Sequence, residues 1–176
     1  MRDSIDAVII GSMGVGASHF GRQMGAIELD QIAGVSDKLD WVIDRSELPE
    51  HGAYVVGPTE FEPQEWITKL NPDVIWFVTT TPDVYRKICE LKARDLDYEE
   101  SPDLRDHYLR ASRITNEAFF YFQISVREDV LDIARETDAL VLRFVNCAKP
   151  EEIEASWKAE KITEDVTADE KSDTIN

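Results

Sequence analysis

The sequence predicts an α/β protein, in which helices cover both faces of a mostly parallel sheet of about five strands. Two nearly uninterrupted apolar runs, residues 7–10 and 73–78, have the pattern of strands buried on both faces, which is typical of a parallel sheet. Stretches with a strand pattern alternate along the chain with stretches of helical periodicity. We therefore expect a three-layer sandwich.

Each strand is expected where apolar and β-branched residues cluster between turn signals. The expected strands are residues 5–10, 26–30, 39–43, 73–78 and 140–145. Helices are expected where the apolar period is helical or where a helix-start signal occurs, such as the proline of Thr81-Pro82-Asp83. The expected helices are residues 18–24, 63–70, 81–94, 104–122, 126–136 and 150–161.

The charged stretch Asp95–Asp106 has no apolar face and is predicted to be a mobile loop. One domain is expected over residues 1–162, with a lid at about residues 92–106. Residues 163–176 are polar and acidic, so we expect them to form a disordered tail.

Composition limits the class of protein further. The 176 residues are 43% apolar and include four tryptophans, which favours a globular fold. No apolar run approaches the roughly 20 residues that span a bilayer, the N-terminus does not look like a secretory signal, and the two cysteines make no disulfide framework. We expect a cytoplasmic protein with no membrane contact. The net charge of −17 disfavours nucleic acid as a partner, and a homodimer stays open.

The segment GSMGVGASHF, residues 11–20, comes directly after the first expected strand and departs by one residue from each of two phosphate-binding motifs. The P-loop motif G-x-x-x-x-G-K-[ST] fits except that Ala17 stands where lysine belongs. The dinucleotide motif G-x-G-x-x-G fits except that Met13 replaces the middle glycine. Both motifs present backbone N–H groups to an anion at the start of a helix. The candidate nucleotide-binding residues here are Gly11, Ser12, Met13, Gly14, Val15, Gly16, Ala17 and Ser18.

Ligands of parallel sheets bind at the carboxyl ends of the strands, so three stretches are expected to converge: the glycine loop, residues 44–46 and residues 79–81. Asp44 is a candidate Mg²⁺ ligand and Arg45 a candidate phosphate ligand, although the pair could also cap a helix and form a surface ion pair. Lys92 and Arg94 could clamp a transferring phosphate from a lid, or simply neutralise a helix C-terminus.

Several stretches together resemble the deoxynucleoside kinase and thymidylate kinase family of P-loop phosphotransferases. They are the glycine loop, WVIDRS (41–46), YVVGP (54–58), NPDVIWFVTTTPDVYRKI (71–88), KAR (92–94), HYLRASRITNEAFF (107–120) and VLRFVNCAKPEEI (141–153). The resemblance extends to about residue 160. The order and spacing of these stretches are more specific than any single motif among them.

The resemblance implies an ATP-dependent transfer of the γ-phosphate to a nucleoside or nucleoside monophosphate. It implies a P-loop NTPase kinase type of fold, Mg²⁺ held by Ser18 and Asp44, and an adenine-side loop containing Asn146 and Lys149. It also implies a carboxylate base, for which Glu28 or Asp30 is the candidate. The missing lysine and a shortened segment before WVIDRS depart from the family, so the chain could be an inactive nucleotide-binding pseudokinase or an interaction protein.

A second resemblance competes with the first. VIIGSMGVGASH followed by EPQEWITKLNPDVIWFVTTTPDVY is similar to the nicotinamide-binding half of sugar-oxidoreductase-type dehydrogenases. Those enzymes place a lysine-proline site and a large second domain after the corresponding strand, and here only Lys149-Pro150 offers such a pair. The kinase resemblance explains residues 92–153 better, so we expect a phosphotransferase.

Overall fold

The computed structural model of the chain describes residues 5–12, 14–28, 52–55, 70–96 and 101–159. The chain divides into two compact units. The first comprises residues 1–81 and 115–146, and the second comprises residues 82–114 and 147–176. Each unit is described by itself below.

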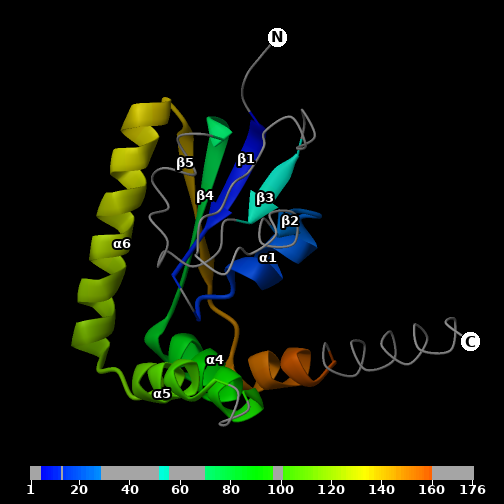
Figure 1. The fold of residues 1–176 in the computed structure, drawn as a ribbon, viewed down its shortest axis with the longest axis vertical. Helices are drawn as coiled ribbons and strands as arrows, with labels where there is room; N and C mark the ends of the chain where they lie inside the picture. Colours follow the sequence, from blue (N-terminus) through cyan, green and yellow to red (C-terminus); the bar gives the residue numbers. More distant parts are fainter. Residues whose placement is uncertain (1–4, 13, 29–51, 56–69, 97–100, 160–176) are drawn as a thin grey trace, which may run out of the picture. The chain divides into compact units, whose positions relative to one another are not determined.

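The first unit contains a parallel sheet of five described strands, which confirms the predicted α/β class (Figure 1). The spatial order of the strands is β2-β3-β1-β4-β5. The sheet therefore extends from its centre in two directions, with β3 and β2 on one side of β1 and with β4 and β5 on the other. The strands are β1 (Ile5–Ile10), β2 (Ile27–Glu28), β3 (Ala53–Val55), β4 (Pro72–Thr80) and β5 (Leu140–Asn146).

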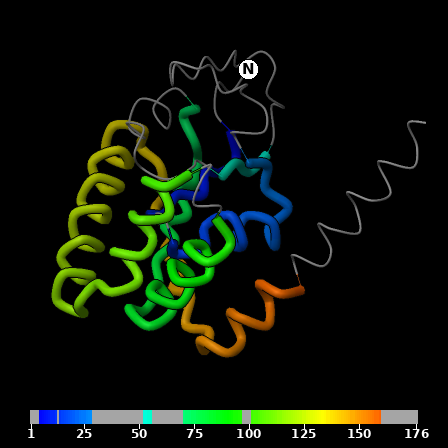
Figure 2. Tube along the Cα trace, turned by 60° about the horizontal axis from the view of Figure 1, so that its bottom comes forward, coloured from blue at the N-terminus to red at the C-terminus, as the bar shows by residue number. Residues whose placement is uncertain are grey.

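Two helices of this unit cover opposite faces of the sheet, as Figures 1 and 2 show for α1 (Ala17–Gln23) and α6 (Asn116–Thr137). Alternate residues of β4 point to opposite faces, because side chains in a strand alternate. Ile75 and Phe77 belong to the core that includes the α6 residues Val126, Val130 and Ile133. On the other face, the ring of Phe20 in α1 packs on Trp76 and stacks on Phe144, with centroid distances of 5.5 and 4.4 Å. The unit is thus a three-layer arrangement.

The second unit is helical. It contains α4 (Pro82–Asp95), α5 (Pro102–Ala111) and a helix at residues 150–159. One face of α4 is buried, including Tyr85, Ile88 and Leu91. Arg105 of α5 donates from Nε to the carbonyl oxygen of Ala93, 3.1 Å away, so α5 is tied to the end of α4.

Two helix boundaries differ from the prediction. A loop was expected up to Asp106, but α5 begins at Pro102, where proline occupies the first turn and Asp103 carries a favourable negative charge. A single helix was expected over 104–122, but α5 ends at Ala111 and a second helix, α6, begins at Asn116. The Thr115 side chain accepts a hydrogen bond from the Ala118 N–H at 3.1 Å, so it caps α6, which then continues without the expected break to Thr137.

Candidate functional site

The glycine loop connects β1 to α1. Gly14 and Gly16 have φ values of 83° and 88°, a left-handed conformation that residues with a Cβ adopt only with strain. The N–H of Val15 donates to the carbonyl oxygen of Ser12 at 3.3 Å, which folds the loop back on itself. The helix begins at Ala17, and its N-cap residue, Gly16, has no side chain that could form a cap hydrogen bond. The glycine-containing segment therefore ends where α1 starts.

Gly11 allows this loop to lie against β4. A Cβ built on Gly11 would be 2.6 Å from Val15 Cγ2 and 3.0 Å from the carbonyl oxygen of Val78. The first distance is too short for a real Cβ, and the second is tighter than most real Cβ contacts and is made to the backbone of β4, which cannot easily move away. The glycine is therefore required for close packing of the loop on the neighbouring strand.

A buried polar bridge joins the loop to β4 through α6. The hydroxyl of Thr79 donates to Gln123 Oε1 at 2.6 Å, and Gln123 Nε2 donates to the hydroxyl oxygen of Ser12 at 3.2 Å. Ser12 and Thr79 are 4% and 2% exposed, so both hydroxyls are shielded from water. Two of the stretches expected to converge at the carboxyl edge of the sheet, the loop and residues 79–81, are thus brought together.

Gln123 was missed in the sequence. The sequence signal is a single amide side chain between the aromatic residues 119–122 and Ile124. Gln123 belongs to α6, which has one buried face. A polar residue in such a position has to find a hydrogen-bond partner when it is shielded from water. The partners, however, lie 44 and 111 residues away in the sequence, so their identity could not be inferred from local patterns.

Asn146, a predicted adenine-side residue, is the last residue of β5 and pairs in register with Thr80. The Thr80 hydroxyl donates to the backbone carbonyl oxygen of Asn146 at 2.8 Å. The carboxyl ends of β4 and β5 are therefore fastened together next to the bridge from Thr79. The adenine contact itself remains a prediction.

Ser18, a predicted Mg²⁺ ligand, lies in the first turn of α1 and is exposed. Its hydroxyl donates to Glu28 Oε2 at 3.3 Å. Glu28 belongs to β2, so the first helix and the edge strand place a hydroxyl and a carboxylate side by side. Oxygen donors of this kind suit a hard cation such as Mg²⁺.

Four of the predicted site residues lie outside the described residues: Met13, Asp30, Asp44 and Arg45. Within the described ranges, no group of three or more His, Cys, Asp or Glu side chains is arranged to hold a metal ion. The metal-binding role of Asp44 and the catalytic roles of Asp30 and Arg45 stay predictions.

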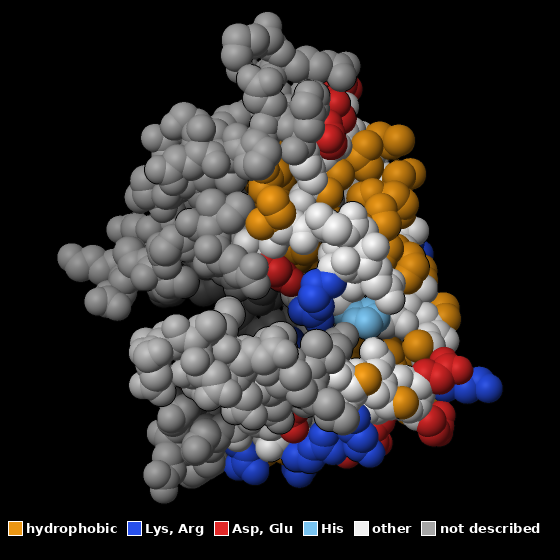
Figure 3. All heavy atoms as spheres, turned by 90° about the vertical axis from the view of Figure 1, so that its right-hand side faces the viewer, with side chains coloured by type: hydrophobic (Ala, Val, Ile, Leu, Met, Phe, Trp, Pro, Cys, Tyr) orange, Lys and Arg blue, Asp and Glu red, His pale blue; other side chains and the backbone are white. Residues whose placement is uncertain are grey.

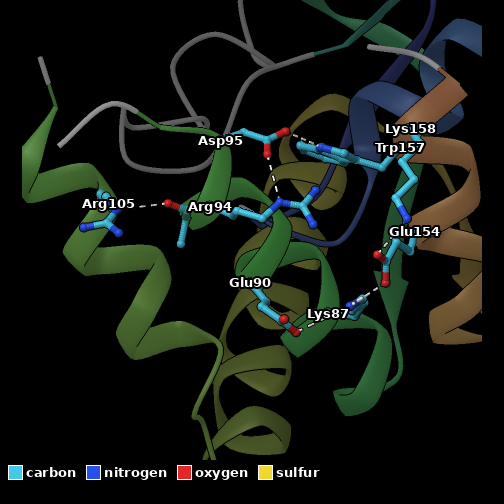
Figure 4. A network of polar contacts seen from close by, with 9 residues as sticks. Lys87, Glu90, Arg94, Asp95, Arg105, Glu154, Trp157 and Lys158 are labelled. Carbon is cyan, nitrogen blue, oxygen red and sulfur yellow. Dashed lines mark hydrogen bonds and ion pairs between the residues drawn. The ribbon is translucent and has the colours of Figure 1, made fainter. Parts of the chain in front are cut away.

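Lys92 and Arg94, the predicted lid cations, belong to the second unit and contact other residues of that unit. Lys92 Nζ is 3.3 Å from the hydroxyl oxygen of Tyr108 and 5.2 Å from the centroid of its ring. Arg94 Nε pairs with Asp95 Oδ1 at 3.2 Å, and Asp95 also accepts a hydrogen bond from Trp157 (Figure 4). Lys92 and Arg94 are thus both engaged by side chains of the helical unit, and these contacts need no ligand.

A second set of ion pairs in this unit, drawn in Figure 4, joins α4 to the helix at 150–159. Glu154 lies 2.9 Å from Lys87 Nζ and 3.1 Å from Lys158 Nζ. The hydrogen bond from Lys87, together with that from Lys158, lowers the pKa of the Glu154 carboxyl to about 2. The same hydrogen bond raises the pKa of Lys87.

Lys149 precedes the helix at 150–159. Its carbonyl oxygen accepts from the N–H groups of Glu152 and Ile153, both at 3.0 Å, and its own N–H donates to Glu152 Oε2 at 2.9 Å. Lys149 is thus the N-cap of that helix. It follows the last residue of β5 by three positions, so the Lys149-Pro150 pair comes just after the strand that neighbours β4.

The described surface carries both signs of charge. On the face drawn in Figure 3, acidic and basic side chains are interspersed, and hydrophobic side chains gather along one edge. None of the helices in the described ranges is long and apolar enough to cross a membrane.

Comparison of the chain with models of known protein families finds no match, and comparison with curated proteins finds none either.

Proposed function

We propose that this chain binds a nucleotide by its phosphates at the carboxyl edge of β1 and β4. The observation that carries the proposal is the Ser12–Gln123–Thr79 bridge, which joins the glycine loop to the end of β4. The sheet extends in opposite directions from these two strands. In open parallel sheets, such a switch point is where ligands bind.

The chemistry of the loop suits an anion. Left-handed glycines let successive backbone N–H groups turn toward one side, and the start of α1 has no capping side chain to occupy its N–H groups. The chain as a whole has a net charge of −17, which repels phosphate groups at long range. Binding therefore has to rely on directed hydrogen bonds at the loop and on a bound cation.

The nucleotide we favour is ATP with Mg²⁺, in a phosphotransferase of the nucleoside or nucleotide kinase type. Ser18 Oγ and Glu28 Oε2 are 3.3 Å apart, close to the distance of about 3 Å between neighbouring oxygen ligands of an octahedral Mg²⁺. A bound Mg²⁺ would offset charge on the phosphates. Ala17 supplies no cation where these enzymes have lysine, so we expect ATP binding with slow phosphoryl transfer to a nucleoside or its monophosphate.

A nicotinamide dinucleotide is the second candidate, and the place of Lys149-Pro150 in the sequence, just after β5, favours it. Dehydrogenases with a similar first half need a lysine-proline pair, and here the pair follows the strand that neighbours β4. A dinucleotide is also bound at its pyrophosphate by backbone N–H groups, without a loop lysine, so Ala17 is no obstacle to it.

Calorimetric titration separates the two. The full chain is titrated with ATP plus Mg²⁺, with ATP plus EDTA, with NAD⁺ and with NADP⁺, and each titration is repeated with Glu28→Gln. The exposed α6 residue Glu128 provides the matched control, Glu128→Gln. We expect saturable ATP binding that weakens about tenfold or more without Mg²⁺, and a similar loss in Glu28→Gln only when Mg²⁺ is present.

Dinucleotide binding that is independent of Mg²⁺, without ATP binding, would replace the kinase proposal with the dehydrogenase one. If none of the four titrations shows binding to the unmodified chain, the nucleotide-binding proposal is wrong. A scaffold or interaction protein would then be the better description.

A further inference from the structure

The hydrogen-bond directions in the buried bridge can be assigned from its distances. The contact between Thr79 Oγ1 and Gln123 is 2.6 Å, as for an O–H···O bond, whereas that between Ser12 Oγ and Gln123 is 3.2 Å, as for an N–H···O bond. The carbonyl end of the Gln123 amide therefore faces Thr79 and the amino end faces Ser12. Thr79 donates, and Ser12 accepts.

This polarity leaves the hydroxyl proton of Ser12 to be donated elsewhere. A serine hydroxyl has one proton to give and two lone pairs. The lone-pair side faces Gln123 Nε2, and within the described part of the chain no acceptor for the Ser12 proton is found. Ser12 is only 4% exposed in the chain without a ligand, and a buried donor without an acceptor is destabilising. The acceptor has to come from outside the described residues, and a phosphate oxygen of a nucleotide at the loop is a group that the proposed function supplies.

We infer that Ser12 donates its hydroxyl proton to a phosphate oxygen of the bound nucleotide, and that Gln123 is the positioning residue that makes Ser12 a donor. This inference rests on the proposed nucleotide binding and adds a side-chain contact to it. The Thr79–Gln123–Ser12 bridge fixes the direction in which the serine proton is available before the ligand arrives. Preorganisation of this kind lowers the ordering cost of binding.

Gln123→Glu provides a test that a merely structural role would not pass. The carboxylate has no proton to donate, so it accepts hydrogen bonds from both the Thr79 and the Ser12 hydroxyls. The bridge stays intact, but the Ser12 proton is now used inside the protein. Ser12→Ala removes the same donor directly. The exposed α6 residue Ser125 gives the matched control, Ser125→Ala.

The probes are ADP and inorganic pyrophosphate, titrated against the full chain with Mg²⁺. A hydrogen bond to a charged phosphate predicts about ten- to hundredfold weaker binding of both probes for Ser12→Ala and for Gln123→Glu, with no change for Ser125→Ala. Gln123→Glu also adds a negative charge, which could repel phosphate by itself. The double variant Ser12→Ala with Gln123→Glu is the control for this repulsion. In the Ser12→Ala background, Gln123→Glu should weaken binding by less than threefold further if it acts through the Ser12 proton, and by its full factor if it acts by repulsion alone.

The possible results distinguish failure of the Ser12 and Gln123 inference from failure of the proposed nucleotide binding. If the unmodified chain binds the probes and Ser12→Ala binds them equally well, the Ser12 contact is wrong and nucleotide binding stands. A full effect of Gln123→Glu in the Ser12→Ala background overturns the positioning role. If the unmodified chain binds neither probe, both the proposed function and this inference fail. Thermal unfolding of each variant checks that lost binding is not lost folding.

Discussion

Gly21 of α1 lies so close to Val55 of β3 that a Cβ built on the glycine would be 2.2 Å from Val55 Cγ2. The same helix carries Phe20, which packs on Trp76 of β4 and Phe144 of β5. The α1 helix is therefore anchored on the sheet by the ring of Phe20. Gly21 allows this close approach because it has no side chain.

Gly21→Ala is predicted to destabilise the protein, although alanine normally stabilises a helix relative to glycine by about 0.5–1 kcal/mol. The overpacked methyl group should cost more than that gain, with a net loss of about 1–2 kcal/mol in the free energy of unfolding. Urea unfolding measures the change. Gly52→Ala is the control, because its Cβ would meet only ordinary contacts at 3.4 Å or more with Tyr54.

The second variant, Gly21→Ala with Val55→Ala, tests the cause. Removing Val55 Cγ2 gives the new methyl group room, so the two substitutions together should cost at least 1 kcal/mol less than the sum of their separate costs. Strict additivity would show that the contact with Val55 is not the reason for the glycine.

Ala17→Lys is predicted to speed phosphoryl transfer more than it tightens ATP binding. A lysine at the first position of α1 would meet negative charge that grows on the phosphates in the transition state. A gain of about a hundredfold in ATP consumption is expected with one member of a panel of deoxynucleosides and their monophosphates. Ala17→Gln, of similar length but neutral, is the control. ATP binding without turnover in Ala17→Lys would identify the chain as a pseudokinase scaffold.

Acid should weaken the second unit through Glu154. Because its pKa is lowered from 4.5 to about 2 in the folded state, the carboxylate stabilises the fold fully above the higher value, and this stabilisation disappears as the pH falls to about 2. We expect Glu154→Gln to be less stable than the parent at neutral pH and equal to it near pH 2. Unfolding monitored by tryptophan fluorescence from pH 7 to 2 gives both curves. A difference that does not change with pH would exclude the ion pairs as its cause.

Most of the described sheet could be predicted because its signals are local, but β3 (Ala53–Val55) was not among the expected strands, and the strand expected at 39–43 lies outside the described residues. The apolar run of β4 predicts a strand that is buried on both faces, and the glycine spacing predicts the turn into α1. The last two residues of β4 were not predicted as strand. Thr79 and Thr80 are polar, and they are buried only because Gln123 and the Asn146 carbonyl accept their hydroxyl protons.

The candidate site was predicted in part for the same reason. The loop was found from its glycine spacing, but the bridge to Gln123 depends on contacts across 111 residues and leaves no periodic pattern. Lys92 was assigned to a lid from its charge, whereas its contact with Tyr108 depends on how α5 packs on α4. Charge and spacing identify a residue type, but packing decides its partner.

The central claim, that the glycine loop and the end of β4 bind phosphate groups, is tested most directly by nuclear magnetic resonance. The amide signals of the ¹⁵N-labelled chain are followed during titration with ADP and Mg²⁺. The account predicts saturable shifts that are largest at Gly11, Gly14, Gly16, Ala17 and Thr79 and that weaken in Ser12→Ala. Saturable shifts that leave these amides unchanged, or no shifts at millimolar ADP, would contradict it.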